Sequence, residues 1–151
     1  MSHTRRATTA GLSAIRAIQE ATLTEPWPEL LEPAVEEVFP CFVRESTVAE
    51  VVGYLVAIPD GADHIVYVPE LAVHPSYQGE GHGSVLLSAL VEAFSHYDEV
   101  RVTVDATDER ARQFYERRGF VVRDRLDGYF ERTDGLLMSR TKLNQSTATG
   151  G

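Results

Sequence analysis

The feature that most limits how this chain can fold is a run of alternating glycines, Gly79, Gly81 and Gly83, between two apolar segments. The segment before the glycines, 65–73, is rich in β-branched residues and predicts a strand, and the segment after them, 84–94, carries leucines at helical spacing. Glycine lets the backbone approach a ligand closely, and the first amides of a helix lie at the positive end of its dipole. A strand, a glycine loop and a helix in this order therefore predict a binding site for an anion, of which a diphosphate is the natural example.

Other phosphate-binding loops fit this segment less well. A dinucleotide-binding loop follows the first strand of a parallel sheet, whereas this loop follows a predicted antiparallel meander. The lysine of an NTP-binding loop is also missing, since Lys142 is the only lysine in the chain. The sequence therefore argues against a Rossmann domain and against NTP hydrolysis.

The residues ahead of the glycine loop predict two helices and a hairpin-rich sheet. Their apolar spacing gives a short strand at 5–10, helices at 11–21 and 29–39, and strands at 41–45, 50–58 and 65–73. The second helix is expected to bury Val38, and turns are expected at Ser46-Thr47 and Pro59-Asp60-Gly61. Pro69 interrupts the last strand, and because proline has no N–H it predicts a bulge or a splayed edge there.

The residues after the glycine loop predict alternating helices and strands. They give a helix at 84–94, a strand at 100–104, a helix at 108–118 and strands at 120–122 and 136–141. Thr107 or Asp108 is expected to cap the helix at 108–118, and Gly119 to end it. The order βααβββαβαββ predicts an α/β (α+β) fold with a mixed, mostly antiparallel central sheet and helices on both faces.

Length and composition set broad limits. The 151 residues suit one domain, which we expect to span 1–143, followed by a disordered tail of small polar residues at 144–151. Cys41 is the only cysteine, so no intrachain disulfide can form, and no Cys and His residues have zinc-ligand spacing. No apolar run has the length of a membrane span and no signal peptide is evident, so a soluble, cytoplasmic protein without a membrane partner is expected.

The charge distribution excludes one class of partner. The net charge is −9, and residues 1–100 hold only 4 of the 14 basic residues but 15 of the 23 acidic ones. Nucleic-acid binding requires clustered Lys and Arg, so no nucleic-acid partner is expected. The acidic part could attract a cationic substrate, or it could be a solvated surface of the kind that suits a salty cytoplasm.

Two motifs resemble a known family. The segment Val73-x-Pro75-x-x-Gln78-x-x-Gly81-x-Gly83 resembles the coenzyme A loop of the GNAT superfamily of N-acyltransferases. The segment Ala111-x-x-Phe114-Tyr115-Glu116-x-x-Gly119-Phe120 resembles the family's later helix and the start of its next strand. The closing residues 128–138 are similar to the ribosomal-protein-alanine N-acetyltransferase subgroup. The chain is thus identified as a member of the GNAT N-acetyltransferases.

The resemblance implies acetyl-CoA as co-substrate and no metal. It also implies a V-shaped splay between the fourth strand, 65–73, and the fifth, 100–104, where the pantetheine arm pairs with the backbone of Leu71 and Val73. The residues that we expect to bind the cofactor are Leu71, Ala72, Val73, Gln78, Gly79, Glu80, Gly81, His82, Gly83, Ser84, Asp108, Arg110, Ala111 and Tyr115. The side chains of His64, His74 and His82 are interpreted as polar surface.

Acetyl transfer to an amine requires a base, donors for the oxyanion and an acid for the departing thiolate. By resemblance, Tyr115 is the general acid and the Val73 amide stabilises the oxyanion. Glu70 is the candidate base, either directly or through water, and Asp105 is a second carboxylate on the sheet that could serve instead. No covalent enzyme intermediate is needed, which agrees with the absence of a nucleophile motif.

Two positions depart from the family pattern. Asp108 occupies the place of an asparagine that often precedes the second motif; it can still cap the helix, but it offers a ligand no amide donor. Thr103 matches the glutamate that is the base in the ribosomal-protein-alanine subgroup, so that residue's role does not carry over.

The sequence therefore predicts an N-acetyltransferase that moves an acetyl group from acetyl-CoA to a primary amine in a ternary complex. The acceptor is either a protein or peptide N-terminus or a small amine. The alternative is a catalytically silent domain that binds acyl-CoA as a sensor. Thiol release from acetyl-CoA in the presence of amines would distinguish the enzyme from the silent domain. A homodimer is possible.

Overall fold

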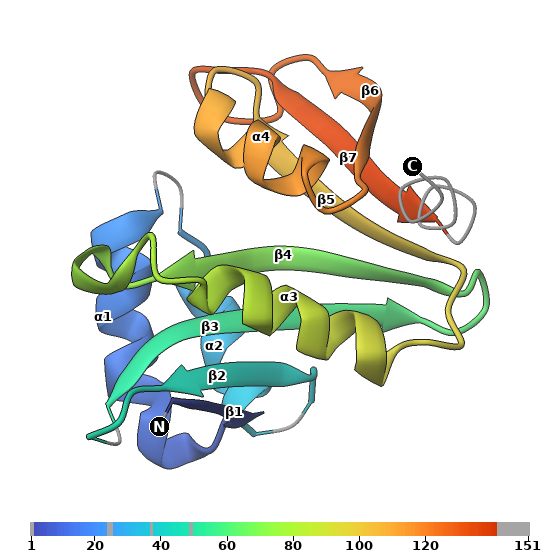
Figure 1. Cartoon of the computed structure of the whole chain (residues 1–151). Helices are drawn as coiled ribbons and strands as arrows, with labels where there is room; N and C mark the ends of the chain where they lie inside the picture. The colour runs from blue at the N-terminus through green and yellow to red at the C-terminus, as the bar shows by residue number, and fades with distance from the viewer. Residues whose placement is uncertain (1, 24–25, 37, 49, 142–151) are drawn as a thin grey trace. The chain divides into compact units, whose positions relative to one another are not determined.

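The computed structural model describes residues 2–23, 26–36, 38–48 and 50–141. Its strands are hydrogen-bonded in the order β1-β2-β3-β4-β5-β7-β6 (Figure 1). Most neighbours are antiparallel and β4 with β5 is parallel, which confirms the predicted mixed α/β fold. The expected tail, 144–151, and the domain end at 143 lie outside the described residues.

The elements follow the predicted order. The strands are β1 (His3–Arg6), β2 (Cys41–Glu45), β3 (Val51–Asp60), β4 (Ile65–Val73), β5 (Glu99–Asp105), β6 (Val121–Leu126) and β7 (Gly135–Thr141). The α-helices are α1 (Leu12–Thr22), α2 (Leu31–Val35), α3 (His82–Ala93) and α4 (Glu109–Glu116). Short 3-10 turns are η1 (Thr9–Gly11), η2 (Pro28–Leu30) and η3 (Pro75–Tyr77).

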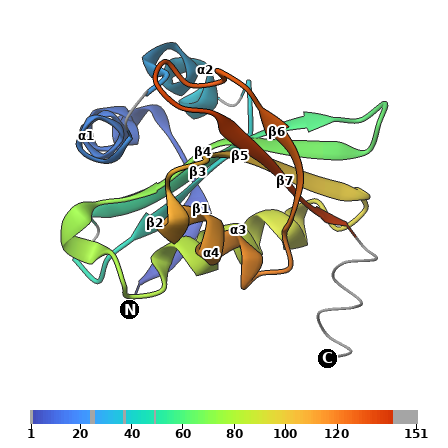
Figure 2. The same ribbon diagram turned by 90° about the horizontal axis from the view of Figure 1, so that it is seen from above.

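The chain forms two compact units. The first comprises Met1–Ile58 and Pro69–Ser95, and the second comprises Pro59–Val68 and His96–Gly151. Within the first unit, α1 and α2 lie on one face of β2 and β3, and α3 lies on the other (Figure 2). The apolar stripe of α1 packs with α2 and the strands in a core that includes Ile15, Ile18, Leu31 and Tyr54, each at most 1% exposed.

The second unit is built around β5, which pairs in parallel with the first residues of β4 and antiparallel with β7. The parallel register runs from Ile65 opposite Glu99 to Val68 opposite Val102. It therefore ends immediately before Pro69, at the residue where the sequence predicted that pairing would be interrupted, while β4 itself continues to Val73. Helix α4 packs against β5 and is followed by Gly119, whose φ of +89° gives the expected left-handed end.

Two predicted boundaries in the first unit are wrong. The first strand lies at His3–Arg6 rather than at 5–10, where it pairs with β2. The second helix ends at Val35 rather than at 39, and Val38 is 64% exposed instead of buried. The Val38 N–H donates to the Pro33 carbonyl (2.9 Å), five residues back, so the α-helical pattern of bonds to the fourth preceding residue has already ended there.

The turn between β3 and β4 begins later than predicted. Pro59 and Asp60 belong to β3, and the turn follows at 61–64. The Asp60 carboxylate accepts hydrogen bonds from the backbone of Ala62 (3.1 Å) and Asp63 (3.2 Å), which is how aspartate initiates a turn two residues on. None of the helices described is both long and apolar enough to cross a membrane.

Candidate active site

The glycine loop is open and left-handed at two of its glycines. Gly79 and Gly81 have φ values of +83° and +87°, and a Cβ at either position would meet no atom within 4 Å. Gly81 is also the N-cap of α3 and has no side chain with which to cap it. The start of this 12-residue helix therefore faces open space beside the glycines, with its dipole favouring a negative group.

Side chains fix the loop to the end of β4. The Gln78 amide donates to the Val73 carbonyl (3.0 Å), and the backbone of His74 donates to the Val52 carbonyl of β3 (2.8 Å). The His74 ring accepts from the Ser76 backbone (3.0 Å) as the N-cap of η3. These contacts hold the residues ahead of the glycines to the end of β4 and to the start of β3.

His82 is not the polar surface residue that the sequence suggested. It is the first residue of α3 and is only 7% exposed. Arg44 of β2 donates to His82 Nδ1 (3.1 Å), which in a neutral ring places the proton on Nε2. That nitrogen lies 3.5 Å from a Glu80 carboxylate oxygen and makes no hydrogen bond within the described residues. His82 thus links the glycine loop to β2.

The backbone of β4 runs close to β3 where Leu71, Ala72 and Val73 lie. A Cβ on Gly53 of β3 would be 3.1 Å from the Ala72 carbonyl oxygen and 3.3 Å from the Leu86 side chain of α3. Ala72 is buried, whereas Leu71 and Val73 are half-buried. Gly53 therefore permits the close packing of β3 against β4 and α3 just ahead of the glycine loop.

Glu70, the candidate base, is a buried carboxylate that receives hydrogen bonds on both oxygens. Oε1 accepts from the Tyr54 hydroxyl and from Gln19 Nε2, each at 2.8 Å. Oε2 accepts from the Trp27 backbone N–H (3.0 Å) and from the same Gln19 nitrogen (3.1 Å). Glu70 is 5% exposed, so these donors replace the water that an ionised carboxylate otherwise binds.

Two titratable groups lie near Glu70. Burial, reinforced by the Glu70 charge and hydrogen bond, raises the pKa of Tyr54 far above its ordinary range. Burial also raises the pKa of the Cys41 thiol to about 12, although Arg6 partly opposes the rise. Both groups are therefore neutral at physiological pH, and Tyr54 is a fixed donor to Glu70.

In the second unit, Asp108 caps α4. Its carboxylate accepts from the Ala111 backbone (2.9 Å), so of the two predicted caps it is Asp108 that serves. Arg110 is exposed and Ala111 is half-buried. Arg112 is tied to its own helix, 3.3 Å from Glu116 and 3.6 Å from Glu109.

Tyr115 is buried on α4, with 8% of its surface exposed. Its ring meets Phe114 and Phe120 edge to face, with centroids 5.1 and 5.2 Å away. Burial raises the pKa of Tyr115, although Arg118 lowers it in part. The phenol therefore keeps its proton at neutral pH.

The other candidate base, Asp105, ends β5 and holds two loops of the second unit. Its carboxylate accepts from the Thr107 backbone (2.8 Å), the Thr107 hydroxyl (2.7 Å) and the Thr133 hydroxyl (2.8 Å). Partial burial acts to raise the pKa of Asp105, but the hydrogen bonds from Thr107 and Thr133 outweigh it and the pKa is lowered. Asp105 is therefore a weaker base than an ordinary aspartate.

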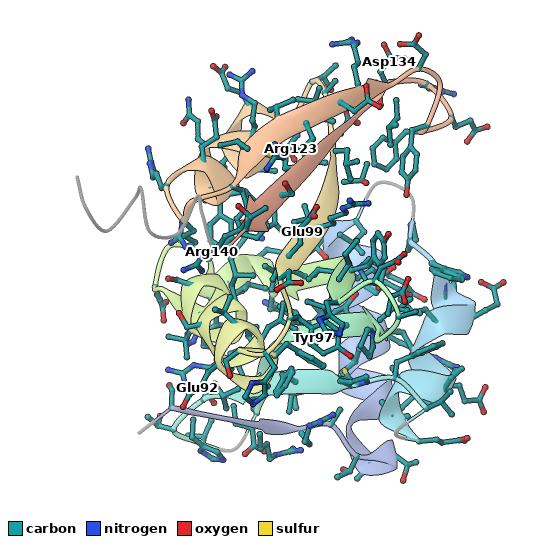
Figure 3. The ribbon with its side chains drawn as sticks, turned by 90° about the vertical axis from the view of Figure 1, so that its right-hand side faces the viewer. Glu92, Tyr97, Glu99, Arg123, Asp134 and Arg140 are labelled. Carbon is teal, nitrogen blue, oxygen red and sulfur yellow. The ribbon has the colours of Figure 1, made fainter. Side chains whose placement is uncertain are left out.

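The loop that joins β6 and β7 is organised by Asp134 (Figure 3). Its carboxylate accepts from the Gly128 backbone (2.8 Å) and from Arg125 Nε and Nη2 (3.0 and 2.9 Å). Gly128 has a φ of +64°, and Tyr129 next to it is 57% exposed. Asp134 thus gives a fixed shape to the residues that resemble the ribosomal-protein-alanine subgroup.

The candidate residues divide between the two units. Glu70, Leu71, Ala72, Val73 and the residues from Gln78 to Ser84 lie in the first unit, whereas Asp105, Asp108, Arg110, Ala111 and Tyr115 lie in the second. The first group forms one continuous strand, loop and helix start. Within the described residues, no group of three His, Cys, Asp or Glu side chains is arranged to hold a metal ion.

Sequence reasoning missed the partners of Glu70. Gln19 lies 51 residues away and Tyr54 lies 16 residues away, on α1 and β3. One signal was present, because Gln19 occupies the apolar stripe of α1 beside Ile15 and Ile18 and is 1% exposed. A polar side chain on a buried helix face needs a buried partner, and that partner is Glu70.

Several solved structures share this architecture. The ribosomal-protein-S18-alanine N-acetyltransferase from Escherichia coli has a TM-score of 0.83 and 20% identity, covering 93% of this chain and 94% of its own. Arabidopsis thaliana NAA60, in complex with a bisubstrate analogue, has a TM-score of 0.84 and 18% identity, covering 93% and 98%. A spermidine N-acetyltransferase SpeG chimera from Vibrio cholerae and hSSAT has a TM-score of 0.77 and 19% identity, covering 98% of each chain. At these identities the likeness shows the fold alone.

The fold is thus one that N-acetyltransferases share, and the sequence adds the family. Residues 12–120 match the model of the acetyltransferase (GNAT) family, so the chain belongs to that family. Membership confirms the resemblance inferred from the two motifs and supports acyl-CoA-dependent acetyl transfer as the general activity. A comparison with curated protein sequences found no match.

Proposed function

We propose that this protein is an N-acetyltransferase that moves the acetyl group of acetyl-CoA directly to a primary amine in a ternary complex. One observation carries the proposal: the open glycine loop at the start of α3 follows, after the short turn η3, a strand whose buried glutamate, Glu70, is held by fixed donors. An anion site and a positioned carboxylate on one continuous segment fit a reaction that needs both a diphosphate-bearing carrier and a base.

The carrier's diphosphate is assigned to the amides at Gly79–Ser84, where the helix dipole and the absent Cβ atoms favour it. Its pantetheine amides are assigned to the backbone of Leu71 and Val73, beyond the end of the β4–β5 pairing. We assign four residues of the second unit to cofactor binding as well: Asp108, Arg110, Ala111 and Tyr115. The contribution of Asp108 is indirect, because its carboxylate caps the start of α4.

The chemistry assigns one task to each of three groups. Glu70 accepts the amine proton, directly or through water, and the Val73 amide donates to the oxyanion. Tyr115 gives a proton to the departing thiolate, and the raised pKa that burial imposes means that the proton is present at neutral pH. The lowered pKa of Asp105 makes it a weaker base than an ordinary aspartate, which argues against Asp105 in this role.

The acceptor belongs to one of two classes, a polypeptide N-terminus or a small amine. The solved structures with this fold include a ribosomal-protein-alanine acetyltransferase and a spermidine acetyltransferase chimera, which supports keeping both classes in the screen. The acidic excess of residues 1–100 favours an acceptor that arrives as a cation.

Thiol release tests the proposal. The protein is incubated with acetyl-CoA and a panel of N-terminal peptides, polyamines and aminoglycosides, and calorimetry measures the affinity for coenzyme A separately. We expect coenzyme A binding and amine-dependent thiol release. Binding without release for any acceptor would favour the alternative, a silent acyl-CoA-binding domain, and the lack of any binding heat would overturn both.

A further inference from the structure

Gln19 and Glu70 together hold both main-chain groups of Trp27. The Trp27 N–H donates to Glu70 Oε2 (3.0 Å), and its carbonyl accepts from Gln19 Nε2 (3.0 Å). Because Gln19 also donates to both oxygens of Glu70, the two side chains and the backbone of Trp27 form a closed set of hydrogen bonds. We call this set the Trp27 clasp.

The clasp joins parts of the first unit that are distant in sequence. Gln19 lies on α1, Glu70 on β4, and Trp27 directly before η2. Gln19 and Glu70 are 1% and 5% exposed, whereas the Trp27 side chain is 50% exposed. The connection therefore runs from a buried carboxylate to an aromatic side chain at the surface.

Glu70 is stabilised in the clasp by neutral donors: an amide, a backbone N–H and the Tyr54 hydroxyl. When the carboxylate takes up a proton, one of its acceptor positions becomes a donor. The protonated group then repels one of the donors now directed at it. A proton on Oε2 would oppose the Trp27 N–H, so proton uptake at this oxygen and the hold on Trp27 depend on each other, whereas the Tyr54 hydroxyl can turn to accept a proton on Oε1.

We propose that Gln19 is a positioning residue, which orients Glu70 for proton uptake and couples it to the segment around Trp27. This inference rests on the proposed function, in which Glu70 is the base. In this proposal Gln19 does not contact the substrate and affects the reaction only by orienting Glu70. It does so through the hydrogen bonds of its amide group and not through the space that its side chain fills.

The chain contains its own reporter, because Trp27 is the only tryptophan. Acrylamide quenching of its fluorescence measures how firmly the segment is held, without any substrate. The test variant is Gln19→Met, which keeps a long side chain but removes both hydrogen-bond donors. The matched control is Glu20→Gln, which changes the exposed neighbour on the same helix.

We expect Gln19→Met to raise the quenching constant about twofold and to lower kcat about tenfold, because Glu70 loses a buried hydrogen bond to its charge. The apparent KM for acetyl-CoA should not change, since the glycine loop is not touched, and Glu20→Gln should match the wild type in every measurement. Unchanged quenching or unchanged kcat in a folded Gln19→Met protein overturns the proposal, as does an equal effect in Glu20→Gln.

A second variant tests the same hydrogen bonds in case the Gln19→Met protein does not fold. Glu70→Gln keeps the shape of the side chain but presents an amide nitrogen to donors, so quenching should rise by a similar factor. In the double variant the effect should not exceed that of the larger single change, because both remove the same clasp. Additive effects, or normal quenching in Glu70→Gln, overturn the proposal. If the wild type releases no thiol with any acceptor, the proposed function fails, and the quenching results still decide whether the clasp exists.

Discussion

The hydroxyl of Tyr54 donates a 2.8 Å hydrogen bond to Oε1 of Glu70, and both side chains are at least 95% buried. The bond connects the middle of β3 with β4 at the point where its pairing with β5 has ended. Tyr54 therefore belongs at once to the apolar core of the first unit and to the candidate site.

Removing this hydroxyl should destabilise the protein. In Tyr54→Phe the ring remains but the buried charge loses a donor, which should lower the free energy of unfolding by about 2 kcal/mol. Urea unfolding followed by circular dichroism measures the change. Tyr129→Phe is the control, since Tyr129 is 57% exposed. A Tyr54→Phe protein as stable as the control would show that Glu70 does not depend on this bond.

Substitutions of two glycines separate backbone strain from ligand binding. Gly81→Ala forces a residue with a Cβ to adopt a φ of +87° and should lower the free energy of unfolding by about 1 kcal/mol. Gly128→Ala, at a φ of +64° in the loop between β6 and β7, should have a similar cost. Calorimetry should find weaker coenzyme A binding only in Gly81→Ala. Equal affinities in the two variants would contradict the assignment of the diphosphate to this loop.

Asp134 should stabilise the protein in a pH-dependent way. Hydrogen bonds from Gly128 and Arg125 hold the pKa of Asp134 below its ordinary value. Its contribution is therefore fully present above about pH 4, the ordinary value for aspartate, and is lost as the pH falls through the folded pKa.

The comparison of wild type with Asp134→Asn across pH tests this dependence. The difference in unfolding free energy should be constant near neutral pH and should shrink as the solution becomes more acidic. Asp127→Asn, in the same loop, is the control for the change of charge. A difference that grows on acidification would mean that the sign of the shift is wrong.

The thiol of Cys41 should be unreactive in the folded protein. Burial raises its pKa to about 12, so almost no thiolate exists at pH 8. Titration with a chromogenic disulfide should detect no protein thiol before denaturant is added and one thiol afterwards. A fast reaction in native buffer would contradict both the burial and the pKa. The same result matters for the enzyme assay, because the reagent then reports only thiol released from acetyl-CoA.

Local patterns were sufficient to predict much of the fold. Cys41–Glu45 and Ile65–Val73 form strands at the predicted residues, because β-branched runs next to turn residues are strong local signals. The glycine loop was also predictable, since Gly79 and Gly81 adopt the left-handed backbone that their residue type permits.

Features that depend on distant residues were not predictable. The first strand is polar, and it is held at His3–Arg6 by the ion pair of Arg5 with Glu45 of β2 (2.9 Å) and by the contact of His3 Nε2 with the same carboxylate (2.7 Å). No local pattern reveals a partner 40 residues away. The hydrogen bond between Gln19 and Glu70 could not be predicted for the same reason, because the two residues are far apart in the sequence. The local sequence indicates only that each is a polar residue among apolar ones.

Tyr115→Phe tests the proposed acid directly. Burial raises the pKa of Tyr115, so in the wild type the phenol carries a proton for the thiolate at every pH that an assay would use. Without the hydroxyl, kcat should fall about 100-fold, the range of a lost general acid. The ring contacts with Phe114 and Phe120 remain, so coenzyme A affinity and stability should change little.

The control for this substitution is Phe114→Tyr, which adds a hydroxyl to the neighbouring residue without removing the acid. Stopped assays at several pH values, with calorimetry on the same samples, separate turnover from binding. If Tyr115→Phe turned over at the wild-type rate across the pH range, Tyr115 would be a packing residue and water would have to protonate the thiolate. If instead affinity fell with kcat unchanged, the phenol would bind the carrier and take no part in proton transfer.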